Sequence, residues 1–151
     1  MKEMIKELVS AYGPSGNEGQ VRAIIESLAV KVTDDIRTDS MGNLIVLKKG
    51  TGGGKRVMVA AHMDEIGLVV SYIDKKGFAR VNPVGGVRIP SIMGTLARFA
   101  DGTVATINRE KAMMKGNEVA TWDEIFLDFG VDSAKDCPVG IGDMACLDCA
   151  Y

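Results

Sequence analysis

Residues 56–70, with the sequence RVMVAAHMDEIGLVV, contain the side chains best suited to chemistry in this chain. The apolar run Val57–Ala61 predicts a strand that is buried on both faces. The strand ends at His62, the only histidine in the chain, and the carboxylates of Asp64 and Glu65 follow it. Open α/β sheets bind their ligands at the carboxyl ends of strands, so we expect a functional site here.

His62 and Asp64 are two residues apart, and on a strand such residues point to the same side. Asp64 could accept a hydrogen bond from one ring nitrogen of His62 and leave the other nitrogen to bind a metal. The pair could also belong to a nucleophilic triad, but no G-x-S-x-G motif supplies the nucleophile. A catalytic zinc site needs about three protein ligands, so the spacing alone favours an ordinary core or surface histidine over a metal ligand.

The elements before this run alternate between helical and strand patterns. Residues 2–12 have the apolar spacing of an amphipathic helix. A second helix should run to about Val30, with Ser15 as its N-cap and Glu18 completing a capping box. Short strands are expected at residues 36–38 and 44–47, and together these segments indicate helices that lie on a sheet.

The glycine-rich stretch Gly50–Lys55 lies between the predicted strands. Its spacing does not match a phosphate-binding loop, and a strand rather than a helix is expected after it. We therefore interpret it as a flexible hairpin loop.

The second half of the chain has the pattern of short strands joined by turns that contain glycine. Hairpins are predicted over 68–81 and 95–107, with further strands at 125–129 and 144–149 and a short helical turn at 133–136. This composition is typical of a small barrel or sandwich. The predicted domains are residues 1–70 and 71–151.

Composition excludes several classes of protein. The chain is 46% hydrophobic and 25% charged, as in globular proteins, and its net charge of -2 provides no basic surface for nucleic acid or an anionic membrane. Its apolar runs are too short to cross a bilayer. Three cysteines near the C-terminus do not form a disulfide framework, so we expect a cytoplasmic protein in which Cys146 and Cys149 are ordinary strand residues.

The run AAHMDEIGLVV resembles the first metal-binding motif of the M42 family of metallo-aminopeptidases. This family includes tetrahedral, deblocking and glutamyl aminopeptidases, and some members have been labelled endoglucanases. Five further segments resemble family segments in the same order along nearly the whole chain: YGPSGNEGQVR, DSMGNLIVLKKG, GFARVNPVGGV, FLDFGVDSAKD and VGIGDMACLD.

The resemblance implies an α/β fold, in which the first part of a doubly wound metallopeptidase domain (phosphorylase/hydrolase-like) precedes a PDZ-like or barrel-like dimerisation domain. It implies that His62 binds one of two zinc or cobalt ions, and that Asp64 orients His62 and counts as catalytic. The implied activity is hydrolysis of N-terminal residues from peptides through a metal-activated water. Family dimers assemble into dodecamers, so a homo-oligomer is also implied.

Family members are much longer than this chain, and their remaining metal ligands and general base would lie beyond Tyr151. We therefore expect the chain alone to be inactive, to bind at most one ion weakly and to expose apolar surface over Val57–Ala61. The alternative is a non-catalytic oligomerisation module or an inactive truncated fragment, in which His62 is vestigial.

Overall fold

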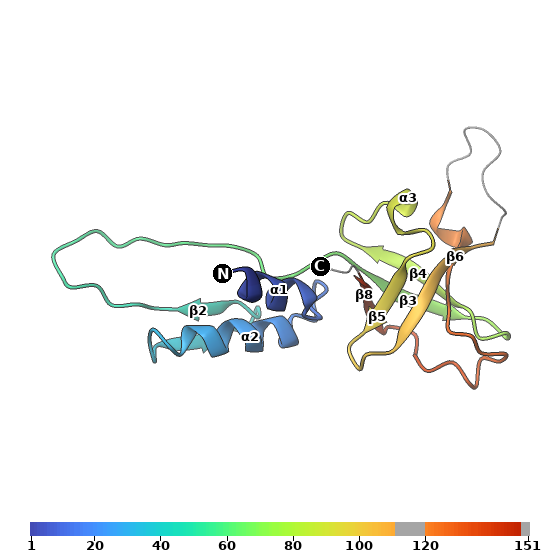
Figure 1. Ribbon diagram of the computed structural model, residues 1–151, viewed down its shortest axis with the longest axis horizontal. Coiled ribbons are helices and arrows are strands. Elements are labelled where there is room, and N and C mark those ends of the chain that lie inside the picture. The colour runs from blue at the N-terminus through green and yellow to red at the C-terminus, as the bar shows by residue number, and fades with distance from the viewer. Residues whose placement is uncertain (111–119, 149–151) are drawn as a thin grey trace. The chain divides into compact units, whose positions relative to one another are not determined.

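The structure, a computed structural model, describes residues 1–110 and 120–148 and divides the chain into two compact units (Figure 1). The first unit ends at Asp64 and the second begins at Glu65. This division falls before the boundary that we expected after residue 70, because strand β3 (Gly67–Ile73) pairs with other strands of the second unit. Within the described ranges, no helix is long and apolar enough to cross a membrane.

The second unit is a closed barrel of antiparallel strands in the order β3-β4-β7-β6-β5-β8. This arrangement confirms the predicted hairpins and selects the barrel over the sandwich. The expected last residue of the final strand, Cys149, lies outside the described residues. The strands that follow β3 are β4 (Ala79–Val84), β5 (Leu96–Phe99), β6 (Val104–Arg109), β7 (Ile125–Asp128) and β8 (Met144–Asp148).

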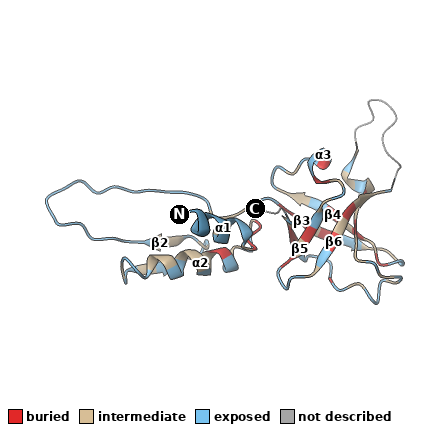
Figure 2. Ribbon diagram, in the orientation of Figure 1, coloured by how far each residue is buried: buried red, intermediate tan, exposed pale blue. Residues whose placement is uncertain are grey.

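Alternate residues of the barrel strands fill its interior, as expected for a small barrel in which side chains occupy the lumen (Figure 2). The strand residues of this core cluster are Leu68, Val70, Ala79, Val81, Ala97, Phe99, Ala105, Ile107, Ile125, Leu127 and Ala145. A single helical turn, α3 (Ile89–Ile92), adds two isoleucines to this core. The sequence did not predict it, because four residues are too few to establish a helical period. Trp122, in the 3-10 helix η1 (Trp122–Glu124), also packs against the core.

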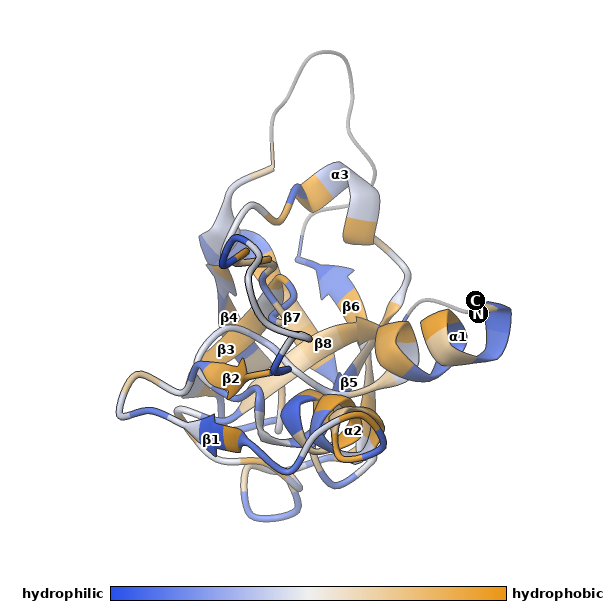
Figure 3. Cartoon of the chain, turned by 90° about the vertical axis from the view of Figure 1, so that its left-hand side faces the viewer, coloured by the Kyte–Doolittle hydropathy of each residue, from blue (hydrophilic) through white to orange (hydrophobic). Residues whose placement is uncertain are grey.

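The first unit consists of two helices and a small antiparallel sheet, close to the predicted elements. They are α1 (Lys2–Ser10), α2 (Gly19–Ala29), β1 (Ile36–Thr38) and β2 (Leu44–Val46). The helices combine apolar and polar side chains, as the spacing predicted (Figure 3). Few residues are buried here, and those that are include Tyr12, Pro14 and Val21.

The predicted strand Val57–Ala61 is wrong, because the segment has no regular secondary structure. A strand needs neighbours for its backbone hydrogen bonds, and in the described residues β1 and β2 pair with each other instead. The predicted exposure is confirmed, since Val57, Met58 and Val59 all face solvent. Every strand pair in the described residues is antiparallel, so a doubly wound parallel sheet stays a proposal.

The predicted capping box at the start of α2 is also wrong. The helix begins at Gly19, and Glu18 occupies the N-cap without a side-chain hydrogen bond to the helix. Ser15 instead bonds a residue far along the chain, as described below. Glu18 Oε1 accepts a hydrogen bond from the backbone N–H of Gly16 at 2.5 Å, which stabilises the turn rather than the helix.

Two hairpin glycines share the same backbone conformation but differ in how closely other atoms surround them. Gly77 and Gly102 share a φ of +89°, a conformation that favours glycine. An added Cβ at Gly77 would lie 2.6 Å from Val131 Cγ2 and 2.8 Å from the Ser133 carbonyl oxygen, whereas nothing lies within 4 Å at Gly102. We expect Gly102→Ala to lower the free energy of unfolding by about 1 kcal/mol through strain alone, and Gly77→Ala by about 3 kcal/mol.

Urea unfolding, followed by the fluorescence of the single tryptophan Trp122, measures both changes. Equal losses of stability in the two variants would contradict the packing that the structure gives to Gly77.

Candidate metal site

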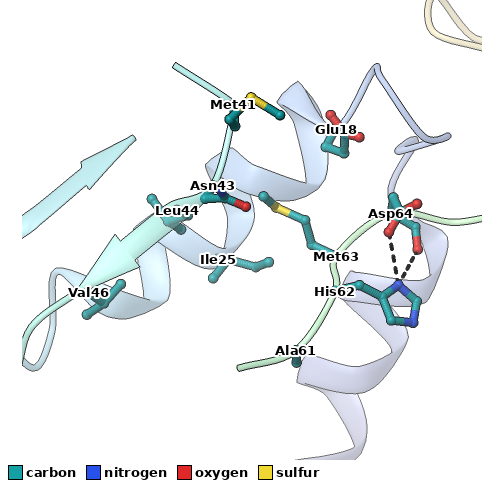
Figure 4. Close-up of a pocket in the computed structure, with 11 residues that line it drawn as sticks. Glu18, Ile25, Met41, Asn43, Leu44, Val46, Ala61, His62, Met63 and Asp64 are labelled. Atoms are coloured by element: carbon teal, nitrogen blue, oxygen red, sulfur yellow. Dashed lines mark hydrogen bonds and ion pairs between the residues drawn. The ribbon is translucent and has the colours of Figure 1, made fainter. Parts of the chain in front are cut away.

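His62 and Asp64 lie together in the irregular segment that precedes the barrel (Figure 4). His62 Nδ1 is 3.0 Å from Asp64 Oδ1 and 2.9 Å from the Asp64 backbone carbonyl oxygen. The imidazole is 85% exposed and the Asp64 side chain 35% exposed. The two side chains are therefore neighbours, as the sequence predicted, although a bent irregular backbone rather than a strand brings them together.

These contacts determine which nitrogen of His62 carries the proton. A backbone carbonyl and an ionised carboxylate only accept hydrogen bonds, so Nδ1 must be the donor to both. In the neutral ring Nε2 then has the free lone pair. A histidine that donates from one nitrogen to a carboxylate and presents the other is the arrangement found around protein-bound metals.

Ser15 is the third member of this cluster, although the local sequence predicted it to be a helix cap. Its hydroxyl donates a hydrogen bond to Asp64 Oδ2, across a separation of 49 residues. Each oxygen of the carboxylate thus has its own donor. Sequence spacing could not reveal this contact, because the local pattern around Ser15 already fits a helix cap.

The electrostatics of the cluster favour the ionised carboxylate. The hydrogen bond from Ser15, and after it the hydrogen bond from His62, holds the pKa of Asp64 below its ordinary value, while desolvation acts in the opposite direction. A charged Asp64 is the form that accepts from both donors and increases the basicity of the imidazole toward a metal.

The same contacts argue against a nucleophilic triad. In a triad the imidazole lies between the hydroxyl and the carboxylate, so that it can remove the hydroxyl proton. Here the carboxylate of Asp64 lies between Ser15 and His62. Ser15 therefore donates to a carboxylate and has no base to activate it through this cluster.

A depression of about 360 Å³ lies beside the pair in the first unit. Figure 4 shows His62 and Asp64 at one side of this depression and Met63 directed toward Ile25 and Asn43. Its lining combines apolar side chains with the polar residues Glu18, Asn43, His62 and Asp64. The residues lining it are Glu18, Ile25, Met41, Gly42, Asn43, Leu44, Val46, Ala61, His62, Met63 and Asp64.

The donor set fits one ligand position of a metal site rather than a complete site. His62 offers Nε2, and Asp64 is occupied in holding the ring. Among the residues that the structure describes, no group of three or more His, Cys, Asp or Glu side chains could hold an ion. A complete zinc site needs about three protein ligands.

The chain combines a histidine held by a carboxylate with a small closed barrel that follows it in the sequence. Residues 42–151 match the M42 glutamyl aminopeptidase family, and the chain belongs to this family. The match includes His62, Asp64 and the described strands of the barrel.

Individual relatives agree with this assignment. The chain is 41% identical over 152 aligned residues to a provisionally named aminopeptidase of Acetivibrio thermocellus, covering 97% of this chain and 44% of the relative. An aminopeptidase structure from Desulfurococcus kamchatkensis is 34% identical with a TM-score of 0.85, covering 97% and 42% of the two chains. The TET1 peptidase of Pyrococcus horikoshii, which can assemble into a tetrahedron or an octahedral shell, is 28% identical with a TM-score of 0.81, covering 97% and 46%. The chain thus spans less than half the length of these relatives.

The hydrogen bond from Ser15 predicts a change in the acidity of Asp64. We expect Ser15→Ala to raise the pKa of Asp64 toward the ordinary aspartate value, because the largest stabilisation of the carboxylate is lost. In the folded protein the pKa lies below that of the unfolded chain. The contribution of this carboxylate to stability is therefore present above the unfolded pKa and is lost as the pH falls through the folded pKa.

Carbon-13 NMR of the aspartate carboxyl groups measures this shift. Asp101 is the internal control, since the backbone N–H and the hydroxyl of Thr103 lower its pKa independently of Ser15. An Asp64 titration that is the same in both proteins would contradict the role of the Ser15 hydrogen bond.

Proposed function

We propose that this chain is part of a metal-dependent aminopeptidase that hydrolyses N-terminal residues from peptides. The observation that carries the proposal is the orientation of His62. Its Nδ1 is occupied by Asp64 and its imidazole is largely exposed, in a chain of the M42 aminopeptidase family. An imidazole held in this way is prepared to bind a metal through Nε2.

His62 would bind one of two divalent metal ions, and Asp64 would hold its ring in the binding orientation. When bound, two such ions supply an activated water and polarise the scissile carbonyl. Imidazole and carboxylate ligands suit both zinc and cobalt, so either metal is compatible with these residues. The remaining ligands and the general base are not provided by the described residues.

The chain alone is therefore expected to bind at most one ion weakly and to lack peptidase activity. A single exposed imidazole offers one coordinate bond, whereas a catalytic site distributes the ion over several ligands. Peptide hydrolysis would require this chain to be combined with the missing ligands. Location in the cytoplasm stays a prediction from the cysteine pattern.

We further propose that the second unit, which begins at Glu65 rather than at the expected residue 71, acts as a dimerisation domain, and that the first unit is part of the catalytic domain. The barrel is closed and has its own core, and it displays large apolar side chains such as Tyr72, Leu96 and Val104. Exposed apolar side chains of this kind are suited to contacts between subunits. The assemblies of the TET1 peptidase support a homo-oligomer, with a dodecamer as the expected form.

A second candidate function is a non-catalytic oligomerisation module. It is favoured by the contrast between the complete barrel and the single metal ligand in the described residues. In that case His62 would have no role in catalysis, and its replacement would leave every activity of the protein unchanged.

An assay with aminoacyl p-nitroanilides separates the two functions. For the native protein, we expect hydrolysis that a chelator abolishes and that zinc or cobalt restores. His62→Ala should remove activity, and Asp64→Asn should weaken metal affinity by about 10-fold to 100-fold, because it replaces the charged partner of the ring. Asp101→Asn is the matched control, since that carboxylate also accepts hydrogen bonds in a turn but lies in the barrel.

The intact mass of the native protein completes this test. A mass well above that of the 151 residues, with activity that depends on His62, would support the aminopeptidase. A mass equal to that of the 151 residues, with no hydrolysis at any metal concentration, would contradict activity in this chain and favour the oligomerisation module.

A further inference from the structure

We propose that Ser15 is a positioning residue for His62 and acts through Asp64. The hydroxyl holds one carboxylate oxygen so that the other stays against the imidazole. The consequence for metal binding rests on the proposed function, but the arrangement of the three side chains does not. Neither the spacing of the motif nor the helix-cap pattern assigns Ser15 this role.

The carboxylate of Asp64 is shared between two hydrogen-bond donors. Oδ2 accepts from the Ser15 hydroxyl, and Oδ1 accepts from His62 Nδ1 at 3.0 Å. A side chain that is about one third exposed would otherwise exchange its partners with water. A donor on Oδ2 restricts rotation of the carboxylate and so keeps Oδ1 directed at the ring.

Ser15 lies on a turn that is held in place by packing and by a backbone hydrogen bond. The preceding residues Tyr12, Gly13 and Pro14 are buried. A Cβ at Gly13 would lie 2.7 Å from Val21 Cγ1 and 3.9 Å from the Met63 carbonyl oxygen, so the turn is packed against both α2 and the segment that carries His62. The Asn17 N–H donates to the Pro14 carbonyl at 2.7 Å and closes the turn.

Ser15 lies three residues before Glu18, the N-cap of α2, so its hydroxyl does not cap this helix. Serine is among the preferred N-cap residues, and a cap hydrogen bond would stabilise α2. The structure instead leaves α2 without a side-chain cap and directs the hydroxyl to Asp64.

The carboxylate is not the sole acceptor for Nδ1, because the Asp64 backbone carbonyl lies 2.9 Å from it. The carbonyl favours the same tautomer, but it is neutral. Only the carboxylate places a negative charge next to the ring and strengthens Nε2 as a donor to a cation. Loss of the Ser15 hydroxyl should therefore weaken the effect of this charge on Nε2 and lower the share of the tautomer protonated at Nδ1.

Nitrogen-15 NMR of these 151 residues provides a direct test, because His62 is the only histidine among them. In neutral His62 we expect Nδ1 to be protonated in the native protein, and Ser15→Ala to increase the share of the tautomer protonated at Nε2. Zinc titrations followed through the same signals should show affinity reduced by about 10-fold, as for other partners of metal ligands. Ser15→Thr, which keeps the hydroxyl, should restore both properties.

Two controls separate positioning from a general structural effect. Ser27→Ala removes a hydroxyl that donates to the Ile24 carbonyl at 2.7 Å in α2, and it should change neither readout. In an Asp64→Asn background, Ser15→Ala should have no further effect on the imidazole, because the group through which it acts is gone. If Ser15→Ala does not fold, Ser15→Cys tests the same hydrogen bond to Asp64 with a side chain of similar size and a weaker donor.

Unchanged imidazole signals in the variant lacking the hydroxyl would overturn the proposal. A shift that is equally large in the Asp64→Asn background would also overturn it, because Ser15 would then act by another route. If the native protein binds no zinc, the proposed function fails, while the tautomer measurement still decides the role of Ser15.

Discussion

The candidate site depends on a single carboxylate shared between two donors. Asp64 joins the turn after α1, through Ser15, to the imidazole of His62. The backbone around His62 is irregular and has no ladder of hydrogen bonds to fix it. The orientation of the ring therefore depends on side-chain contacts, and these are strongest when the acceptor is ionised. The lowered pKa of Asp64 is the electrostatic counterpart of this geometry.

The strands and turns of the barrel could be predicted from sequence because their determinants are local, whereas the choice between barrel and sandwich came from the strand pairing. Residues such as Ile125 and Leu127 alternate with partly exposed neighbours, and this alternation assigns each side chain to one face of the strand. The tight turns at Gly77 and Gly102 are fixed by glycines with positive φ. Once the strands and turns are defined, closure into a barrel removes the unpaired edges.

The first unit shows where such reasoning fails. The run Val57–Ala61 has the composition of a buried strand, but a strand forms only beside a partner, and composition does not provide one. The role of Ser15 was missed for a related reason. Its neighbours Gly16, Asn17 and Glu18 form a convincing local cap pattern, whereas the actual partner Asp64 is 49 residues away. For Val57–Ala61, the lack of a strand partner distant in sequence outweighed the local preference for a strand. For Ser15, the distant contact with Asp64 outweighed the local preference for a helix cap.

The two units also differ in how completely they bury their own apolar side chains. The barrel encloses a continuous core, whereas the first unit leaves Met58 and Val59 almost fully exposed. A catalytic metal site requires ligands held on rigid elements, and an exposed irregular segment meets this requirement poorly. The proposed peptidase function therefore demands both further ligands around His62 and further packing over the apolar run that precedes it. The two demands have a common origin, because a strand at Val57–Ala61, once paired and covered, would also fix the backbone from which His62 extends.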